Sequence, residues 1–249
     1  MKERVMGMVL SAATIGEYDK RIVLLTRERG RISAFVRGAR RPKSPLSAST
    51  EPFTFGEFFI YRGRDSYTVE QTEVKNYFPE LRQNLDSLYM ALYFCEIADY
   101  FSREGMDATD ELNLLYLSLR ALSVPDIPNR LIRYIYEFKM LAIEGEAPRM
   151  FQCMNCGGIR NLHHFYIGQA GILCEDCRRN GNLSLSSQGM TLSETTVYTM
   201  QRILSSPIEK LYSFTVSESI LNELADAVHV YFCSHTDRPF KSLSMLDLL

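Results

Sequence analysis

The chain has 249 residues, 46% of them hydrophobic and 23% charged, and a formal net charge of −2. This length allows one or two domains with a sizeable core, and the composition is ordinary for a soluble globular protein. No apolar run approaches the roughly 20 residues of a transmembrane helix, and the N-terminal MKERVMGMVL lacks the long apolar stretch and cleavage site of a secretory signal, so we expect a cytosolic protein.

Charge is distributed unevenly along the chain. Residues 1–45 contain 11 Lys/Arg and 4 Asp/Glu, a net of +7, whereas residues 46–249 contain 17 Lys/Arg and 26 Asp/Glu, a net of −9. This asymmetry suggests a basic module joined to an acidic body, with a polyanion as the partner of the basic module.

The first 78 residues are predicted to form β-structure. Five short runs are rich in Val, Ile, Phe, Tyr and Thr: RVMGMVL, RIVLLT, ISAFVRG, FTFGEFFIYR and SYTVEQTEV. Turn signals separate them, namely Gly16, the RERG sequence ending at Gly30, the stretch 42–52 with its Pro and Ser residues, and RGRD. Five short strands in this length fit a small closed barrel, for which the OB-fold is one common solution.

The hydrophobic period becomes helical after Pro79. A first helix, which Gly105 ends, is predicted from the spacing of Leu81, Leu85, Leu88, Leu92 and Cys95. Further helices are expected over about 110–123 and 129–144.

A Gly- and Cys-rich segment at 151–183 is expected to be irregular, and helices resume after it. TLSE (191–194) and TVSE (215–218) match the capping-box pattern of helix starts. The last helix carries an apolar side formed by Ile220, Leu221, Leu224, Val228 and Tyr231. The chain is therefore predicted to be an α+β multidomain protein, with a five-stranded OB-fold barrel at 1–79 and an α-helical domain at 80–249 that carries a four-cysteine zinc-binding insert at 151–183.

Four of the six cysteines form two C-x2-C pairs: Cys153, Cys156, Cys174 and Cys177. Two such pairs at this separation match a four-cysteine zinc site, because each turn places two thiolates on one side of a metal. Disulfides are the competing interpretation, but they are rare in the cytosol. Since four thiolates leave no open coordination position, we expect one structural Zn²⁺ per chain. His163 and His164 are interpreted as surface residues, and Cys95 and Cys233 as buried free thiols.

Motifs of common catalytic sites are missing from the sequence. It contains no phosphate loop, no G-x-G-x-x-G after a strand and no G-x-S-x-G elbow. We therefore expect a protein that is not an enzyme.

The segment 27–43, RERGRISAFVRGARRPK, contains seven basic residues and one acidic residue. If 31–37 is a strand, alternate residues point into the barrel, while Arg31, Phe35 and Arg37 point outward with Ser33. An exposed aromatic ring between arginines is typical of single-stranded nucleic acid binding, in which bases stack and guanidinium groups hold phosphates. The alternative, a strand edge guarded by charge, does not account for Phe35.

The chain resembles the RecO family of bacterial recombination mediators. The resemblance rests on GMVLSAATIGEYDKRIVLLTRERGRISAFVRGARRPKSPL, EPFTFGEFF, CMNCGG with CEDC, and RPFKS. It implies an OB-fold, a helical domain, binding to single- and double-stranded DNA, and annealing of complementary strands. Phosphate contacts position DNA without reading its sequence, so such an annealer needs no covalent step. The matched contacts are Lys20, Arg21, Arg37, Arg40, Arg41 and Lys43, and our own interpretation adds Arg27, Arg29, Arg31 and Phe35.

The resemblance also implies protein partners. With RecR, the family helps RecA to replace single-strand-binding protein (SSB) on DNA, and the acidic tail of SSB binds the helical domain. For that tail we expect an apolar cleft with cations on the third helix, namely Arg130, Arg133 and Lys139. No membrane contact is expected, and DNA binding would place this cytoplasmic protein at the nucleoid. Three other functions stay open: an enzyme with an unrecognised site, an RNA-binding or translation-associated factor, and an interaction scaffold.

Overall fold

The computed structural model describes residues 1–64, 66–180 and 189–246. Asp65 of the expected RGRD turn, residues 181–183 of the expected insert and residues 247–249 of the expected helical domain lie outside the described residues. The chain folds into two compact units, one formed by Met1–Pro125 with Phe240–Leu249 and the other by Asp126–Pro239.

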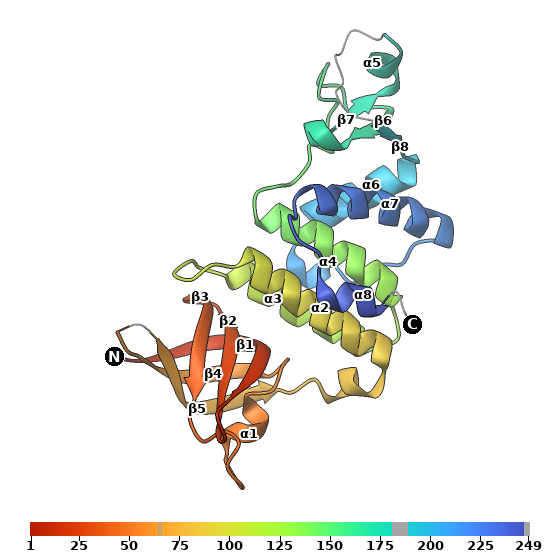
Figure 1. The fold of residues 1–249 in the computed structure, drawn as a ribbon. Coiled ribbons are helices and arrows are strands. Elements are labelled where there is room, and N and C mark those ends of the chain that lie inside the picture. Colours follow the sequence, from red (N-terminus) through yellow and green to blue (C-terminus); the bar gives the residue numbers. More distant parts are fainter. Residues whose placement is uncertain (65, 181–188, 247–249) are drawn as a thin grey trace. The chain divides into compact units, whose positions relative to one another are not determined.

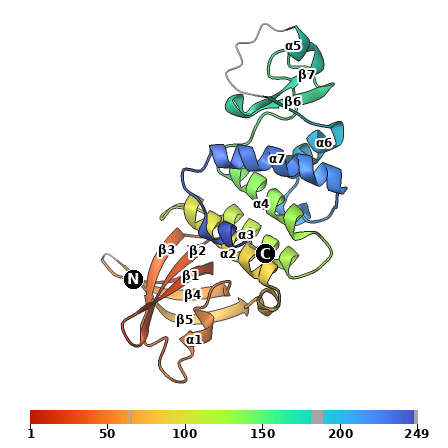
Figure 2. The same ribbon diagram turned by 45° about the vertical axis from the view of Figure 1, so that its right-hand side comes forward.

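Five strands of the first unit form a closed barrel in the order β1-β2-β3-β5-β4 (Figures 1 and 2). The strands are β1 (Lys2–Ile15), β2 (Asp19–Thr26), β3 (Gly30–Val36), β4 (Phe55–Arg62) and β5 (Tyr67–Asn76). Neighbouring strands pair antiparallel except β3 and β5, which pair in parallel. The five-stranded barrel expected from the sequence is confirmed.

Alternation of side chains along each strand fills this barrel. On β3, Ile32, Ala34 and Val36 are fully buried, while the residues between them face outward. They pack with inward apolar residues of other strands, among them Phe58 and Ile60 of β4. Because a shift of one residue would turn every side chain to the other face, burial of this apolar set fixes which residues remain on the outer surface.

The remaining elements of the first unit are helical. They are α1 (Leu46–Ser49), the 3-10 turn η1 (Pro79–Gln83), α2 (Leu85–Phe101), α3 (Thr109–Leu122) and α8 (Lys241–Leu246). The helix expected from Leu81 begins four residues later, because Phe78 has a left-handed conformation and a 3-10 turn follows it. Asn84 then caps α2, its side chain accepting a hydrogen bond from the backbone N–H of Ser87.

The second unit combines three longer helices with a small antiparallel sheet of order β7-β6-β8. Its elements are α4 (Asn129–Ile143), β6 (Leu162–Tyr166), η2 (Ile167–Gln169), β7 (Gly171–Cys174), α5 (Glu175–Arg179), β8 (Gly189–Thr191), α6 (Glu194–Ser205), η3 (Ile208–Lys210) and α7 (Glu218–Ser234). The Cys-rich segment, expected to be irregular, therefore contains regular structure, and we call residues 149–180 the ribbon.

Both helix starts that were expected from capping boxes begin two residues further along. Ser193 caps α6, its Oγ accepting from the backbone N–H of Thr196 at 3.2 Å, and α7 begins after Ser217. In a capping box, a Glu of the same helix accepts a hydrogen bond from the backbone N–H of the capping residue. In α6 this acceptor comes from another helix, because Glu223 of α7 accepts from the backbone N–H of Ser193 at 2.8 Å.

Candidate nucleic-acid interface and metal centre

A row of outward-facing residues crosses four strands of the barrel. Strand pairing sets Arg21 of β2 opposite Phe35, Phe35 opposite Thr68 of β5, and Thr68 opposite Tyr61 of β4. We call these four residues the outer row. Phe35 is 37% exposed and Tyr61 45%, although both are large apolar side chains. Two strand spacings separate the aromatic residues, which is about 10 Å and suits two bases of one strand.

Tyr61 was not among the residues expected from the sequence. Its neighbour Ile60 is buried, so the alternation of FTFGEFFIYR already implies that Tyr61 faces outward. The parallel pairing of β3 with β5, which brings Tyr61 into one row with Phe35, has no comparable signal in the sequence.

Beside the outer row, the loop 37–45 between β3 and α1 folds against the tip of the β1–β2 hairpin. The backbone N–H of Gly38 donates to Asp19 Oδ1 at 2.7 Å, and Arg40 Nη1 donates to the carbonyl of Glu17 at 3.1 Å. The Arg41 guanidinium lies 5.7 Å from the ring centre of Tyr18, which is 42% exposed. These contacts hold the loop against the hairpin.

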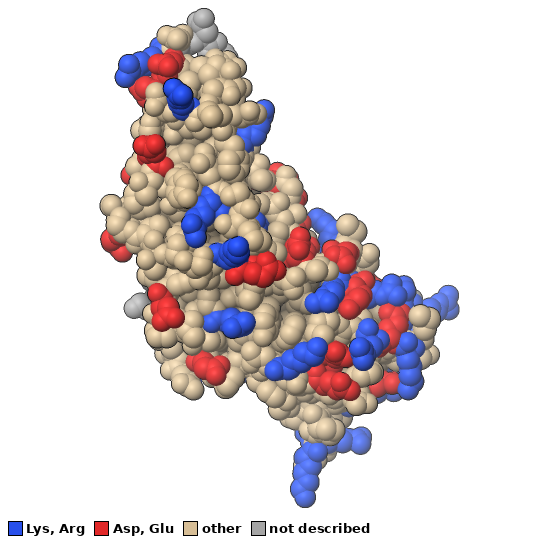
Figure 3. All heavy atoms as spheres, turned by 180° about the vertical axis from the view of Figure 1, so that it is seen from behind, with Lys and Arg blue, Asp and Glu red and all other residues tan. Residues whose placement is uncertain are grey.

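This end of the barrel presents cations without carboxylate partners. Among the described residues, no ion pair involves the cluster that we call the barrel-end cluster: Arg37, Arg40, Arg41 and Lys43. Figure 1 places α1 at the bottom of the picture, and in the rear view of Figure 3 Lys or Arg side chains extend from that lower end with no acidic side chain beside them. A polyanion therefore meets uncompensated positive charge there.

The opposite end of β3 is closed by contacts within the first unit. The turn at Gly30 packs on the segment after α2, where the Arg31 N–H donates to the carbonyl of Arg103 and the Gly105 N–H to that of Arg29. Arg29 Nε lies 2.9 Å from Glu3 Oε2, and this hydrogen bond raises the pKa of Arg29.

Three more residues that were expected to contact DNA lie outside the barrel-end cluster. Arg31 pairs with Asp99 of α2, and Arg27 is exposed beside the packed turn. Lys20 is buried at 8% exposure, where its Nζ lies 2.5 Å from Glu51 Oε1 and 3.0 Å from the Ser47 carbonyl. Lys20 thus ties β2 to α1 and is not presented to a phosphate. The structure brings six of the ten expected residues together on one surface: Arg21, Phe35, Arg37, Arg40, Arg41 and Lys43.

The four expected metal ligands converge in the ribbon. The Sγ atoms of Cys153, Cys156, Cys174 and Cys177 all lie within 4.8 Å of one another. Tetrahedral zinc with Zn–S bonds of about 2.3 Å requires sulfur atoms about 3.8 Å apart. Cys156 and Cys174 have this separation, 3.8 Å. The cluster could therefore hold a metal ion, and its donor set fits zinc.

Backbone groups already prepare one thiol for a metal. Burial raises the pKa of Cys153, but N–H groups of Cys156, Cys174 and Asn155 outweigh it and lower that pKa to about 6. Burial raises the pKa of Cys174 to about 12. A metal must therefore displace a proton from Cys174, so metal affinity increases with pH.

The two histidines of the ribbon are partly exposed and bind other groups. His164 Nε2 lies 2.7 Å from Glu175 Oε2, and His163 Nδ1 lies 3.3 Å from the Leu192 carbonyl. Of the other thiols, Cys95 is buried as expected, but Cys233 is exposed, contrary to the expectation of a buried thiol.

The cations expected to bind a partner tail are largely engaged. Arg130 is exposed and pairs with Glu218 at 3.1 Å, and Arg133 donates to Glu137 at 2.7 Å. Lys139 is buried, because its Nζ donates to the carbonyls of Ile203, Leu204 and Ser206 at the end of α6. The apolar residues beside these cations on α4, namely Leu131, Ile135 and Phe138, are core residues and do not line an open cleft.

Comparisons with known proteins agree with this architecture. A model described as recombination protein O N terminal matches residues 1–78, and one described as recombination protein O C terminal matches residues 82–244. The chain is 31% identical to DNA repair protein RecO of Acetivibrio thermocellus over 98% of its length and 95% of the relative's. It is 32% identical to that of Symbiobacterium thermophilum over 98% and 96%, and 30% to that of Alkaliphilus metalliredigens over 96% of both. In the described part of the chain, no helix is long and apolar enough to cross a membrane.

Proposed function

The chain belongs to the recombination protein O (RecO) family of DNA repair proteins, and from this premise we propose that it is a non-enzymatic recombination mediator that binds DNA through its barrel and anneals complementary strands. In this role it acts with RecR to help RecA replace SSB on single-stranded DNA. The protein works in the cytoplasm, at the nucleoid when it is bound to DNA. We also propose that residues 1–79 and 80–249 are its functional domains.

One observation carries the DNA-binding proposal: aromatic rings and unpaired cations share one surface of the barrel. The outer row supplies Phe35 and Tyr61 for stacking, and the barrel-end cluster supplies charge for phosphates. Neither contact reads a base, so binding is independent of sequence and both single and double strands are accepted. Neutralising two backbones lowers their mutual repulsion, and base pairing then selects the correct partner.

Strand annealing tests this proposal. Complementary oligonucleotides, bare or coated with SSB, are mixed with the protein, and duplex formation is followed by energy transfer between end labels. We expect faster annealing on both substrates, with RecR and RecA needed only for the later exchange of SSB for RecA. The same reactions, supplied with nucleotides, are analysed for hydrolysis. Turnover without annealing contradicts the proposal, and preferential binding of matched single-stranded RNA assigns the barrel to RNA.

The proposed cofactor is one structural Zn²⁺ at the four cysteines. A closed set of four thiolates contributes directly to folding. Cys174→Ser should lower the zinc content from about one per chain and increase protease cleavage within 151–180, while barrel binding to DNA persists. Cys233→Ser, which changes an exposed thiol outside the cluster, is the control. Metal-free protein with an unchanged melting curve contradicts a structural zinc.

We also propose that the SSB tail binds the second unit. Arg130 and Arg133 of α4 remain the candidate cations, since Lys139 is buried. The double variant Arg130→Ala, Arg133→Ala should anneal bare strands normally and SSB-coated strands poorly, and SSB that lacks its tail should reproduce the defect. Equal loss on both substrates means that these arginines hold the fold or contact DNA.

A further inference from the structure

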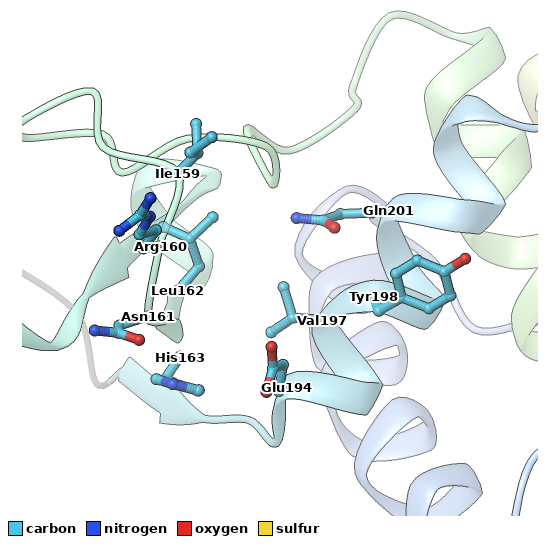
Figure 4. A pocket seen from close by; sticks show the side chains of 9 residues that line it. All are labelled: Ile159, Arg160, Asn161, Leu162, His163, Glu194, Val197, Tyr198 and Gln201. Carbon is cyan, nitrogen blue, oxygen red and sulfur yellow. The ribbon is translucent and has the colours of Figure 1, made fainter.

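A cavity of about 300 Å³ lies in the second unit between the ribbon and α6 (Figure 4). One wall is the segment 159–163, and the other is one side of α6. The Tyr198 ring and the Arg160 side chain point away from this space, so neither contributes to its chemistry. The metal-binding cysteines do not line the cavity, and the proposed function makes no use of it. Its volume is at the lower limit of small-molecule sites, so we expect a small ligand group.

Hydrogen bonds between the ribbon and α6 hold the two walls in place. Gln201 Nε2 donates to the Met150 carbonyl at 2.7 Å, and the Leu192 N–H, just before α6, donates to the His163 carbonyl at 2.8 Å. The cavity is therefore present before any ligand binds.

Five side chains face the cavity. Glu194, Val197 and Gln201 follow one another at three- and four-residue spacing, so they share one side of α6, and Figure 4 shows them directed toward the ribbon. Leu162 and His163 are directed toward them from the other wall. Leu162 and Val197 are buried and form the apolar part of the lining.

The polar groups of this lining accept hydrogen bonds. Because Gln201 Nε2 donates to Met150, Gln201 Oε1 is left as an acceptor. His163 Nδ1 lies 3.3 Å from the Leu192 carbonyl oxygen, which can only accept, so in the neutral ring Nδ1 carries the proton and Nε2 accepts. In the described part of the chain, the Glu194 carboxylate forms neither an ion pair nor a hydrogen bond.

The charge around the cavity favours a cation. The helical part of the unit, residues 126–148 and 189–239, contains 6 Lys/Arg and 10 Asp/Glu, a net of −4. The ribbon has a net of +2, but Arg160, its one arginine in the lining, points outward. An anionic ligand would therefore meet the Glu194 carboxylate without a compensating cation, whereas a cation neutralises it.

The shape of the lining selects among cations. An ammonium group has three rotatable N–H donors and no acceptor, which suits acceptors that come from two opposite walls. A guanidinium holds its five donors in one plane and suits them less well. The buried surface of Leu162 and Val197 matches an aliphatic stem behind the charged group.

We infer that this cavity binds the primary ammonium end of an aliphatic amine, with the ammonium between Glu194 and His163 and the carbon chain against Leu162 and Val197. Two sources carry this chemistry, a lysine side chain of a partner protein and a free alkylamine. Neither DNA nor a metal takes part, so the inference goes beyond the proposed function and can fail without affecting it.

NMR of the methyl groups tests the inference, because Leu162 and Val197 place methyl groups on both walls. The full-length protein, labelled with ¹³C in its Leu and Val methyl groups, is titrated at pH 8 with n-butylamine, n-butanol and tetramethylammonium. We expect n-butylamine to shift the signals of both residues with a Kd of roughly 1 mM. Butanol lacks the charge and tetramethylammonium lacks the donors, so each should bind at least about 10-fold more weakly.

A matched pair of variants assigns the charge. Glu194→Gln keeps the shape of the side chain and removes its charge, so n-butylamine should bind roughly 5- to 10-fold more weakly. Glu209→Gln makes the same change at an exposed residue of the same unit that does not line the cavity, and the affinity should stay as in the parent protein.

A fourth probe, Nα-acetyl-lysine methylamide, carries the same aminobutyl chain on a peptide backbone and separates the two sources. Binding at least as tight as that of n-butylamine assigns the cavity to a lysine of a protein, and weaker binding assigns it to a free alkylamine. The inference is overturned if n-butylamine shifts neither methyl signal at roughly 20 mM, if butanol binds equally well, or if Glu194→Gln leaves the affinity unchanged. Strand annealing by the same preparation tests the proposed function separately.

Discussion

The two ends of strand β3 both carry arginines, yet their surroundings differ. At the Gly30 end, Arg29 pairs with Glu3 and Arg31 with Asp99, and the turn is hydrogen-bonded to the segment after α2. At the other end, none of the four cations of the barrel-end cluster forms an ion pair among the described residues. Local charge density in a sequence therefore identifies a basic segment. Carboxylates that are distant in sequence determine which part of that segment is available to bind DNA.

The largest expected effect comes from removing charge at the open end. The triple variant with alanine at Arg37, Arg40 and Arg41 should flatten the slope of log K against log salt for single-stranded DNA by about 2, because each lost phosphate contact contributes about 0.7. At 0.1 M salt this corresponds to roughly 100-fold weaker binding. Fluorescence anisotropy over a salt series measures both quantities.

A matched triple at the closed end makes that result interpretable. Arg27, Arg29 and Arg31→Ala removes the same formal charge, but its slope should change by less than the value of one phosphate contact, about 0.7. Equal slope changes in the two triple variants would contradict the difference between the two ends, since the whole basic segment would then contact DNA.

A pair of glycines tests the packing of the two ends. Gly30 and Gly38 have φ values of +61° and +65°, so alanine is strained at both positions, by roughly 1–2 kcal/mol. A Cβ at Gly30 would lie 2.0 Å from the Arg103 carbonyl oxygen, whereas at Gly38 it meets the flexible Arg41 side chain at 3.4 Å. Gly30→Ala should therefore cost about 1–3 kcal/mol more than Gly38→Ala in urea unfolding. Equal losses mean that the Gly30 turn is not packed in solution.

Stacking on the outer row has an effect of similar size but of a different kind. Phe35→Ala should weaken single-strand binding by roughly 1–3 kcal/mol and leave the salt slope unchanged, because stacking releases no counterions. Tyr61→Ala should act in the same direction, by at least about 1 kcal/mol. Tyr77→Ala, at an exposed tyrosine outside the row, should have no effect. A changed slope in Phe35→Ala contradicts a stacking role.

Much of this surface follows from alternation in the sequence. The period of two along β3 placed Phe35 outside, and applied to β2 it also places Lys20 on the inner side with Ile22 and Leu24, where the structure has it. The spacing of the cysteines predicted their convergence, because each pair is close in sequence and one ion joins the two pairs.

The missed features depend on partners that are distant in sequence. Arg31 meets Asp99, 68 residues away, and Lys139 meets carbonyl groups 64 to 67 residues away, none of which has a local pattern. The same holds for the parallel pairing of β3 with β5 that aligns Phe35 with Tyr61. Local periodicity thus predicts on which face of a strand a side chain lies. Pairing between residues distant in sequence determines which cations are left without a carboxylate partner.

The smallest expected effect concerns the Arg31–Asp99 pair alone. Both side chains are partly exposed, at 37% and 29%, so solvent and salt screen the pair. Arg31→Ala should lower the free energy of unfolding by less than about 1 kcal/mol, less still at high salt, and leave the DNA slope within error of the parent protein. A double-mutant cycle with Asp99→Ala separates the pair from the other contacts of each residue. A different outcome would be that Arg31→Ala reduces the slope of log K against log salt by the value of one phosphate contact, while the cycle shows no coupling between Arg31 and Asp99. Arg31 would then bind DNA in solution, and the closed end of β3 would open when DNA is present.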